Sequence, residues 1–183
     1  MTKKIGILVG SLRNGSFTRT VATQLAAQLP AGYEAKFLEI GQLPFYNEDI
    51  DTAEGAPEEY DAFRAELDGV DAVLLATPEY NRSYPAVIKN ALDVGSRPYG
   101  HSKFAGKPAL VVSVSPGAIG GFGANHHLRQ VLVFLGMPVV QQPEAYIGSV
   151  HTLLDGDGKI SNPETVAYFQ TIVDAFVDLI ERN

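Results

Sequence analysis

The sequence predicts an α/β fold in which one parallel sheet of five strands is covered by helices on both faces. Three observations support this prediction. Segments with a strand pattern alternate regularly with segments of helical periodicity. Two strand segments, 72–76 and 108–114, are nearly continuous apolar runs, which are typical of strands buried on both faces. No repeat or low-complexity linker interrupts the alternation, so the 183 residues are expected to form a single domain, 1–183.

The first half of the chain supplies three of these strands and two helices. The first helix has apolar side chains three and four residues apart, and Pro30 and Gly32 follow as stop signals. The second helix has Tyr60, Phe63 and Leu67 as candidate inward-facing side chains. In chain order we expect strand 4–10, helix 17–29, strand 35–40, helix 57–67 and strand 71–77.

The second half continues the same alternation. Pro85 suits the first turn of a helix, and Gly136 suits the end of another. The last helix carries an apolar stripe from Phe169 to Ile180, which we expect to face the core or a subunit interface. In chain order we expect helix 85–94, strand 108–114, helix 125–135, strand 137–141 and helix 163–180.

The composition limits the chemistry that the chain can perform by itself. It has no cysteine, which excludes disulfides, cysteine nucleophiles, iron–sulfur clusters and cysteine-based zinc sites. Redox chemistry would therefore need a bound cofactor. The four histidines show no recognised ligand spacing, and the acids at 48–54 are expected to form a solvated loop, so we expect no metal site.

Charge and hydropathy limit the partners. The formal charge is −7, spread over surface segments, which argues against nucleic acid and anionic membrane as partners. No apolar run approaches the length that spans a bilayer, and the short run 5–9 lacks the cleavage site of a signal peptide. We expect a cytoplasmic protein that does not insert into membranes.

Strand order predicts where a ligand would bind. Five strands fit the three-layer, flavodoxin-like order 2-1-3-4-5 with right-handed crossovers. In such folds ligands lie outside the carboxyl ends of the strands, where the strand order reverses. The loops after the first, third and fourth strands should therefore converge on one site.

The first of these loops carries groups that suit a phosphate. Residues 10–18 lack the third glycine of the dinucleotide motif and the Gly-Lys pair of a Walker loop. They offer the hydroxyls of Ser11, Ser16 and Thr18, the guanidinium of Arg13, and free N–H groups at a helix N-terminus. The alternative is that Ser16 only caps the helix and Arg13 is a solvated loop residue.

The other two loops could hold a planar ring. Prolines at 78 and 85 stiffen the segment 77–85, in which the backbone of 79–82 could supply a polar edge and Tyr80 an aromatic surface. The segment 113–123 contains four glycines, which permit positive φ angles and close approach of backbone to a ligand. The alternatives are a turn that only packs on the sheet and a merely flexible connection.

Taken together, these segments resemble the NADPH-dependent FMN reductases, in particular the bacterial quinone, chromate and azo-dye reductases. The resemblance covers nearly the whole chain. It rests on Gly10-Ser11-Leu12-Arg13 with Ser16, on Thr77-Pro78-Glu79-Tyr80-Asn81, and on the segments 43–49, 89–93 and 127–132. It implies an enzyme with tightly but non-covalently bound FMN and with NAD(P)H as co-substrate. Hydride transfer would follow a ping-pong cycle to a small-molecule acceptor such as a quinone, azo compound, chromate or free flavin.

The resemblance also implies a set of binding residues and an assembly. The flavin supplies the chemistry, so no catalytic side chain is expected. The family's members are typically dimers or dimers of dimers, so a homodimer or homotetramer is expected here. The implied cofactor-binding residues are Ser11, Arg13, Ser16, Phe17 and Thr18 around the phosphate and ribityl chain, Pro78, Glu79, Tyr80, Asn81 and Arg82 along the isoalloxazine, and Ser115 and Gly117 at its other edge.

The chain departs from the family pattern at two places. Arg82 stands where relatives often have a tyrosine, and it could attract an anionic acceptor or the phosphates of the nicotinamide cofactor. Quinone-reducing relatives have a tyrosine–arginine–glutamate network between subunits. Glu144 matches its acid, but Gly123 and His126 stand in place of the arginine and a tyrosine.

Two other functions are compatible with the same fold. A flavodoxin-type electron carrier would bind FMN but exchange electrons with a protein partner, and Arg13 and Arg82 argue against it. A regulatory module without flavin would have lost the site, and the three intact loops argue against that alternative. Uptake of FMN and its reduction by NADPH would separate the three possibilities.

Overall fold

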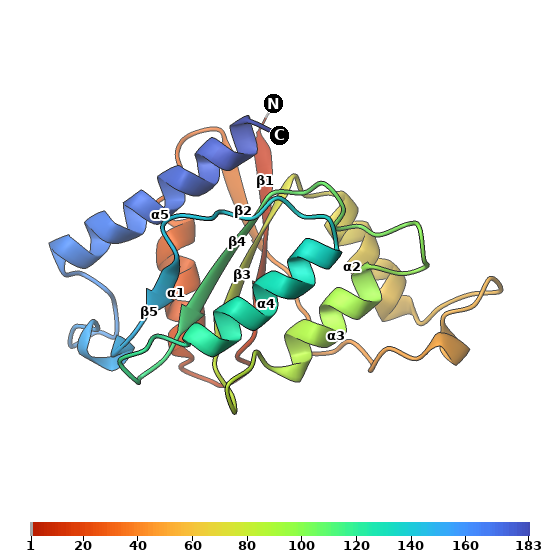
Figure 1. Cartoon of the computed structure of the whole chain (residues 1–183), viewed down its shortest axis with the longest axis horizontal. Coiled ribbons are helices and arrows are strands. Elements are labelled where there is room, and N and C mark those ends of the chain that lie inside the picture. The colour runs from red at the N-terminus through yellow and green to blue at the C-terminus, as the bar shows by residue number, and fades with distance from the viewer. Residues whose placement is uncertain (1) are drawn as a thin grey trace.

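Five parallel strands form a central sheet that helices cover on both faces (Figure 1). This computed structural model describes residues 2–183. The strands are β1 Lys3–Val9, β2 Tyr33–Phe37, β3 Ala72–Pro78, β4 Ala109–Val114 and β5 Ala145–Ile147. The helices are α1 Phe17–Ala26, α2 Glu58–Asp68, α3 Ala86–Gly95, α4 Phe122–Phe134 and α5 Pro163–Glu181, with short 3₁₀ helices at Glu48–Ile50 and Val150–Thr152.

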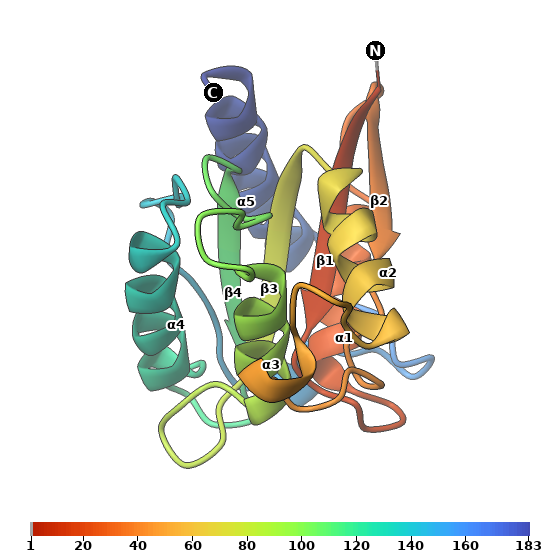
Figure 2. The same cartoon turned by 90° about the vertical axis from the view of Figure 1, so that its right-hand side faces the viewer.

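The layers agree with the predicted fold. The sheet order is β2-β1-β3-β4-β5 and each neighbouring pair is parallel. α1 and α5 cover one face, and α2, α3 and α4 cover the other (Figure 2). None of the helices within residues 2–183 combines the length and the apolarity that a membrane crossing needs.

Burial explains why the central strands lack polar alternation. Every residue of β3 and β4 is buried, because helices lie on both faces of these strands. On β1, Ile5 and Ile7 pack with α1 and α5, whereas Leu8 packs on the opposite face. The stripe from Phe169 to Ile180 is buried against the first of these faces, so it belongs to the core of this chain.

Two helix ends differ from the prediction by three residues. α1 ends at Ala26 because the N–H groups of Gln28 and Leu29 donate three residues back, to Leu25 and Ala26, in a tightened last turn. α4 begins at Phe122 because Gly120 and Gly121 adopt φ of 68° and 77° and turn the chain straight into the helix.

The fifth strand was predicted wrongly. The expected segment 137–141 makes a single bridge, from Val139 to Ala109, and regular pairing with β4 begins only at Ala145. Pro138 and Pro143 have no N–H group to donate to a neighbouring strand. The edge of the sheet is therefore interrupted, and β5 follows the second proline.

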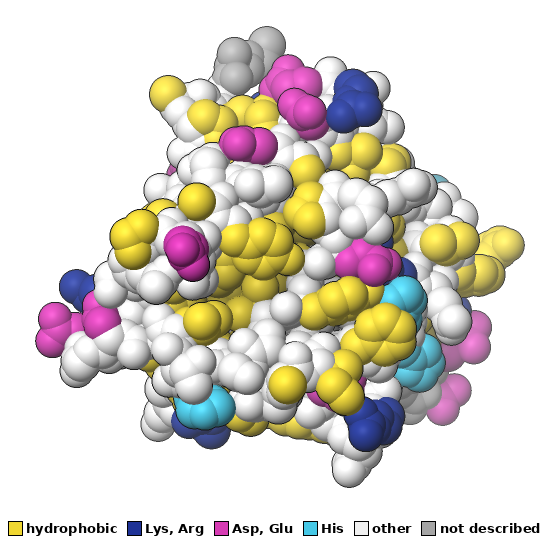
Figure 3. All heavy atoms as spheres, turned by 60° about the vertical axis from the view of Figure 1, so that its left-hand side comes forward, with side chains coloured by type: hydrophobic (Ala, Val, Ile, Leu, Met, Phe, Trp, Pro, Cys, Tyr) yellow, Lys and Arg dark blue, Asp and Glu magenta, His cyan; other side chains and the backbone are white. Residues whose placement is uncertain are grey.

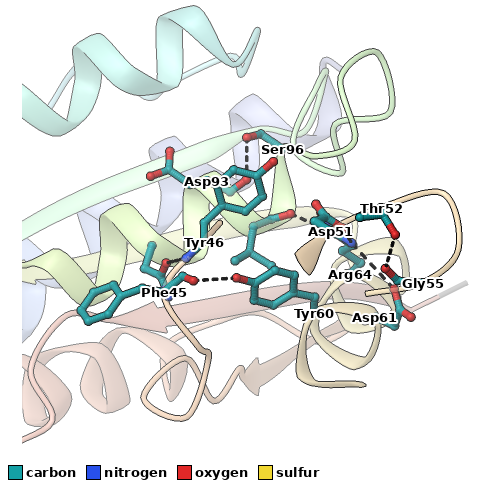
Figure 4. A network of polar contacts seen from close by, with 12 residues as sticks. Phe45, Tyr46, Asp51, Thr52, Gly55, Tyr60, Asp61, Arg64, Asp93 and Ser96 are labelled. Atoms are coloured by element: carbon teal, nitrogen blue, oxygen red, sulfur yellow. Dashed lines mark hydrogen bonds and ion pairs between the residues drawn. The ribbon is translucent and has the colours of Figure 1, made fainter. Parts of the chain in front are cut away.

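Buried polar groups fasten the segment after β2 to α2 and α3 (Figure 4). Arg64 donates to both carboxylate oxygens of Asp51, at 2.9 and 2.6 Å, and to the carbonyl of Val94 at 3.0 Å. The Asn90 amide oxygen accepts the N–H of Tyr46 at 2.7 Å. Asp51 is thus not part of a solvated acidic loop, as the sequence suggested, because the guanidinium compensates its burial.

Candidate functional site

The loops after β1, β3 and β4 lie together at the carboxyl edge of the sheet. Gly10 approaches the second loop so closely that a Cβ atom there would lie 3.1 Å from Pro78 Cδ and 2.6 Å from Ile88 Cδ1. Glu79 of the second loop accepts the N–H of Ala124, in the first turn of α4, at 3.0 Å. The structure therefore brings together the three segments that strand order predicted to converge.

The first loop is a cradle of hydrogen-bond donors. Among the bonds of residues 2–183, the N–H groups of residues 12–15 have no partner, and they precede the N-terminus of α1. A cavity of about 720 Å³ adjoins the loop and is lined by Ser11, Arg13 and Ser16. Ser16 accepts the N–H of Arg19 at 3.2 Å, so it does cap α1, while its hydroxyl proton remains available to a ligand.

The remaining predicted residues of this loop differ in position. Arg13 is exposed, its guanidinium lies 5.3 Å from the centre of the Phe17 ring, and none of the ion pairs described for residues 2–183 involves it. Its charge is available to an anion. Phe17 packs partly against the core, and Thr18 is buried and does not line the cavity. The cavity also includes Lys159, which the sequence did not single out because it lies far along the chain.

The second loop contains a strained turn. Tyr80 and Ser83 exchange N–H to carbonyl bonds of 2.8 and 3.0 Å, and Asn81 and Arg82 between them have φ of 51° and 68°. Two successive positive φ angles define a type I′ turn, which usually contains glycine. Such conformations cost roughly 1–3 kcal/mol per residue and concentrate at ligand-binding sites. Within the described part of the chain, the N–H groups of Asn81 and Arg82 have no partner and are free to meet a ligand.

The Glu79 side chain points toward α4 and away from the turn's free donors. Its carboxylate caps the positive end of α4 through Ala124, so only the Glu79 backbone is left to face a ring. Arg82 is exposed, with Nη1 3.5 Å from Glu79 Oε1. A Cβ atom at Gly123 would lie 2.9 Å from the Arg82 carbonyl oxygen, so the missing side chain at 123 allows the turn to pack on α4.

The third loop is held by its own polar groups. Ser115 Oγ accepts the N–H of Gly117 at 3.0 Å, so these two predicted residues bond to each other. Of the four glycines, only Gly120 and Gly121 adopt positive φ; Gly117 and Gly123 do not. The N–H groups of Ala118 and Ile119 have no partner among the bonds of residues 2–183, so the open donors lie just beyond the predicted pair.

The two adjacent histidines point in different directions. His126 Nε2 lies 2.7 Å from the Tyr146 hydroxyl, whereas His127 Nδ1 lies 2.8 Å from Ser83 Oγ. Burial and a hydrogen bond to Glu144 raise the pKa of Tyr146 to about 12. No group of three His, Asp or Glu side chains in the described part of the chain could hold a metal ion.

A shallow groove lies beside Tyr146, the residue whose hydroxyl contacts His126. It measures about 280 Å³ and is lined by residues of β5, the Val150–Thr152 region and α5, among them Tyr146, Leu153 and Phe169. On the face where these elements lie, hydrophobic side chains gather in and around a hollow, with histidine and acidic side chains beside them (Figure 3). The groove adjoins the third loop, because Gly148 in its lining lies against the Ala118 carbonyl.

Comparison with known proteins gives consistent results along the whole chain. Residues 3–152 match the family described as NADPH-dependent FMN reductase. A quinone reductase of Pseudomonas putida is 54% identical over 179 residues, covering 98% of this chain and 95% of that protein. A 2-hydroxy-1,4-benzoquinone reductase of Burkholderia sp is 42% identical over 176 residues, covering 96% and 95%. The solved structure of FerB, a flavoenzyme NAD(P)H:(acceptor) oxidoreductase from Paracoccus denitrificans, superposes with a TM-score of 0.91 at 41% identity, covering 99% of this chain and 98% of that one.

Proposed function

This chain belongs to the NADPH-dependent FMN reductase family, and on that premise we propose that it passes electrons from NAD(P)H through FMN to a quinone. Its class as an oxidoreductase and its use of FMN and NAD(P)H follow from the family. The quinone is proposed because two of the relatives described above are named for quinone reduction. Azo compounds, chromate and free flavin are the other acceptors that this chemistry allows.

One observation carries the proposal: in all three loops at one edge of the sheet, some backbone N–H groups have no partner within residues 2–183. The donors of residues 12–15, with Arg13 and the α1 N-terminus, suit a phosphate dianion. The donors of Asn81, Arg82, Ala118 and Ile119 suit the polar edge of the isoalloxazine. We propose as cofactor-binding residues Ser11, Arg13, Ser16, Phe17, Thr18, Pro78, Glu79, Tyr80, Asn81, Arg82, Ser115 and Gly117, with the Glu79 side chain acting through α4.

The protein contributes position and electrostatics, and the FMN, when bound, supplies the hydride-transfer chemistry. The first loop holds the phosphate end, because residues 12–15 and the exposed Arg13 guanidinium line one cavity before the N-terminus of α1. The second loop presents fixed N–H groups, because its turn is closed by two hydrogen bonds. Fixed donors stabilise negative charge at the ring edge without reorganising. Proton transfer by a side chain is not needed for hydride delivery, so we assign none.

The first experiment uses the purified protein. We expect it to be yellow, to release FMN on heating, and to lose its flavin absorbance rapidly when NADPH is added in a stopped-flow mixer. A quinone should restore the absorbance. A protein that takes up FMN but is not bleached by NADPH or NADH would be an electron carrier. A colourless protein that refuses added FMN would be a regulatory module.

Arg82 is proposed to attract anionic groups of the incoming substrates. Its guanidinium pairs with Glu79 at 3.5 Å through Nη1, but the side chain is 78% exposed and the rest of the group is open to an anion. The variant Arg82→Ala should raise the KM for NADPH, for an anionic acceptor, or for both. Unchanged values of both Michaelis constants would contradict this role.

We further propose that the chain forms a homodimer through α3 and α4, with a dimer of dimers as the alternative. Val133 and Phe134 of α4 are 74% and 82% exposed, beside a groove of about 390 Å³ between the two helices. Two large apolar side chains at one site are expected to be covered. Light scattering should give twice the 19.7 kDa chain mass, and Phe134→Asp should shift it toward one chain. A wild-type mass of a single chain would contradict the dimer.

Two smaller expectations remain proposals. Residues 1–183 are proposed to act as a single flavodoxin-like domain, which a single cooperative unfolding transition would support and two separated transitions would contradict. A cytoplasmic location is proposed because the chain has no cysteine and so cannot form the disulfides common in secreted proteins, and cell fractionation tests it.

A further inference from the structure

A chain of buried polar side chains lies beneath the third loop. Ser113 of β4 and Asn125 of α4 are both fully buried. The Ser113 hydroxyl donates to the carbonyl of Gly120 at 2.7 Å, and the Asn125 amide nitrogen donates to the Ser113 oxygen at 3.3 Å. The end of the loop is therefore bonded from below to a strand and a helix of the core.

The same chain continues along α4. The Asn125 amide oxygen accepts from Arg129 Nε at 2.8 Å, and Arg129 Nη1 donates to the carbonyl of Val140 at 2.7 Å. The Asn125 nitrogen also faces the carbonyl of Ala145 at 3.3 Å. A carbonyl can only accept and a guanidinium can only donate, so the amide has one possible orientation. The Ser113 hydroxyl has a second, longer acceptor in the Ala145 carbonyl at 3.4 Å, so the bond to Gly120 is the shorter of its two.

Contacts from the side complete the support of the loop. Ser115 donates its N–H to Ile147 at 2.9 Å, and Ser149 donates its N–H to the Gly117 carbonyl at 3.2 Å. A Cβ atom at Gly120 would lie 2.7 Å from the Tyr146 carbonyl carbon, so the loop has no room to move toward β5. The short segment that contains the N–H groups of Ala118 and Ile119 is therefore fixed at both ends by these contacts.

We propose that Ser113 and Asn125 are positioning residues of the FMN site, which fix the direction of the Ala118 and Ile119 N–H groups. This inference rests on the proposed function. Both side chains are fully buried, and the network reaches the loop through the bond from the Ser113 hydroxyl to the Gly120 carbonyl. Burying polar groups is unfavourable unless all are paired, and an apolar side chain at 113 would leave that carbonyl without this partner. Donors whose direction is fixed beforehand stabilise charge at the ring edge without the reorganisation that mobile donors need.

The test compares Ser113→Ala with the matched control Ser96→Ala. Ser96 is also buried and donates to a backbone carbonyl, that of Asp93 at 3.0 Å, but it lies at the C-terminus of α3. We expect Ser113→Ala to raise the Kd of FMN about fivefold and to move the midpoint potential of bound FMN to a more negative value. Ser96→Ala should change neither quantity, while both variants lower the Tm.

One result with Ser113→Ala would overturn the inference. If Ser113→Ala lowers the Tm but keeps the wild-type Kd and potential, its hydroxyl is only structural and the inference is overturned. Should Ser113→Ala fail to fold, Ser113→Cys keeps a similar shape but is a much weaker donor, and a Kd above the wild-type value is expected. Wild-type values of Kd and potential in Ser113→Cys would overturn the inference in that case. A wild-type protein that binds no FMN would overturn the proposed function together with this inference.

Discussion

The first and third loops of the site lie at the same edge of the sheet but are built in opposite ways. The first loop has four successive N–H groups without partners in the described structure, an exposed arginine and an adjoining cavity of about 720 Å³. The third loop is held by Ser113 and Asn125 below and by the segment after β5 at its side. The first loop therefore has its donors open to a ligand, whereas the third loop has most of its polar groups already paired.

This difference separates two requirements of a flavin site. A phosphate carries full charge, so an open set of donors and a cation suffices to bind it tightly. A ring edge carries partial charge that changes during reaction, so its donors must be held in place beforehand. Substitutions in the first loop should therefore mainly change the affinity for FMN. Substitutions near the third loop should mainly change the packing of that loop and the midpoint potential of bound FMN.

The largest effect is expected for Arg13→Ala. A hydrogen bond to a charged group contributes about 2 kcal/mol, which corresponds to a rise of about 30-fold in the Kd of FMN. Titration of the apoprotein with FMN, followed by quenching of flavin fluorescence, measures this. The control is Arg182→Ala at the C-terminal end of α5, which should bind FMN as the wild type does. Equal affinity of both variants would show that the first loop does not hold the phosphate.

A smaller effect is expected for Gly123→Ala, which tests the packing of the second loop on α4. The new methyl group would lie 2.9 Å from the Arg82 carbonyl oxygen and 3.0 Å from Glu79 Oε2. Overpacking of this kind costs about 1–3 kcal/mol, partly offset by the better helix propensity of alanine. Chemical denaturation should show a lower free energy of unfolding, and Gly156→Ala, which meets no atom within 4 Å, is the control. Equal free energies of unfolding in Gly123→Ala and Gly156→Ala would mean that the turn adjusts to the methyl group without loss of stability.

Glu79→Gln tests whether charge at the α4 N-terminus matters. The variant keeps a hydrogen-bond acceptor for Ala124 but loses the negative charge beside the helix N-terminus, so we expect a loss of about 1 kcal/mol. Glu164→Gln is the matched control, because Glu164 lies in the first turn of α5 but is exposed. Thermal unfolding of both proteins gives the comparison, and a larger loss in the control would contradict the capping role.

The smallest effect is expected for Tyr146, which lies behind the third loop, and it concerns stability at alkaline pH. The pKa of Tyr146 is raised to about 12 from an ordinary value of 10.0, so the folded chain retains this proton more strongly than the unfolded chain. The resulting stability is complete below pH 10 and is lost as the pH rises from 10 through 12. Tm measured from pH 9 to 12 should fall less steeply in Tyr146→Phe than in the wild type. Tyr99→Phe, at an 88% exposed position, should keep the wild-type slope, and a wild-type slope in Tyr146→Phe would contradict the prediction.

The sequence was sufficient for those features that depend on local patterns. The strand order, the two helical layers on either side of the sheet and the convergence of three loops followed from apolar runs and from the alternation of elements. Ser11, Arg13 and Ser16 were predicted to bind a phosphate from the hydroxyl-rich, arginine-containing turn between a strand and a helix, and they line one cavity in the structure. The apolar stripe on α5 followed from its spacing, whereas the choice between the core and a subunit interface needed the structure.

The features that were missed depend on contacts between distant segments. Asn125 and Ser113 look like ordinary polar residues in a helix and a strand, and only the fold shows that they meet beneath Gly120. Glu79 is part of a recognisable motif, but its direction is decided by the N-terminus of α4, 45 residues away. The edge strand was misplaced because 137–141 has strand-forming residues, whereas Pro138 within it and Pro143 after it decide which residues can pair.

The two margins of the sheet also bear on how the protein behaves when concentrated. β5 is only three residues long and is preceded by Pro143, and β2, at the other margin, exposes the charged side chains of Glu34 and Lys36. A strand from another molecule needs a longer uncharged row of free backbone groups in order to add to a sheet. Neither margin offers one, so growth of the sheet from molecule to molecule is disfavoured, and the protein is protected against fibril-like aggregation during storage or overproduction.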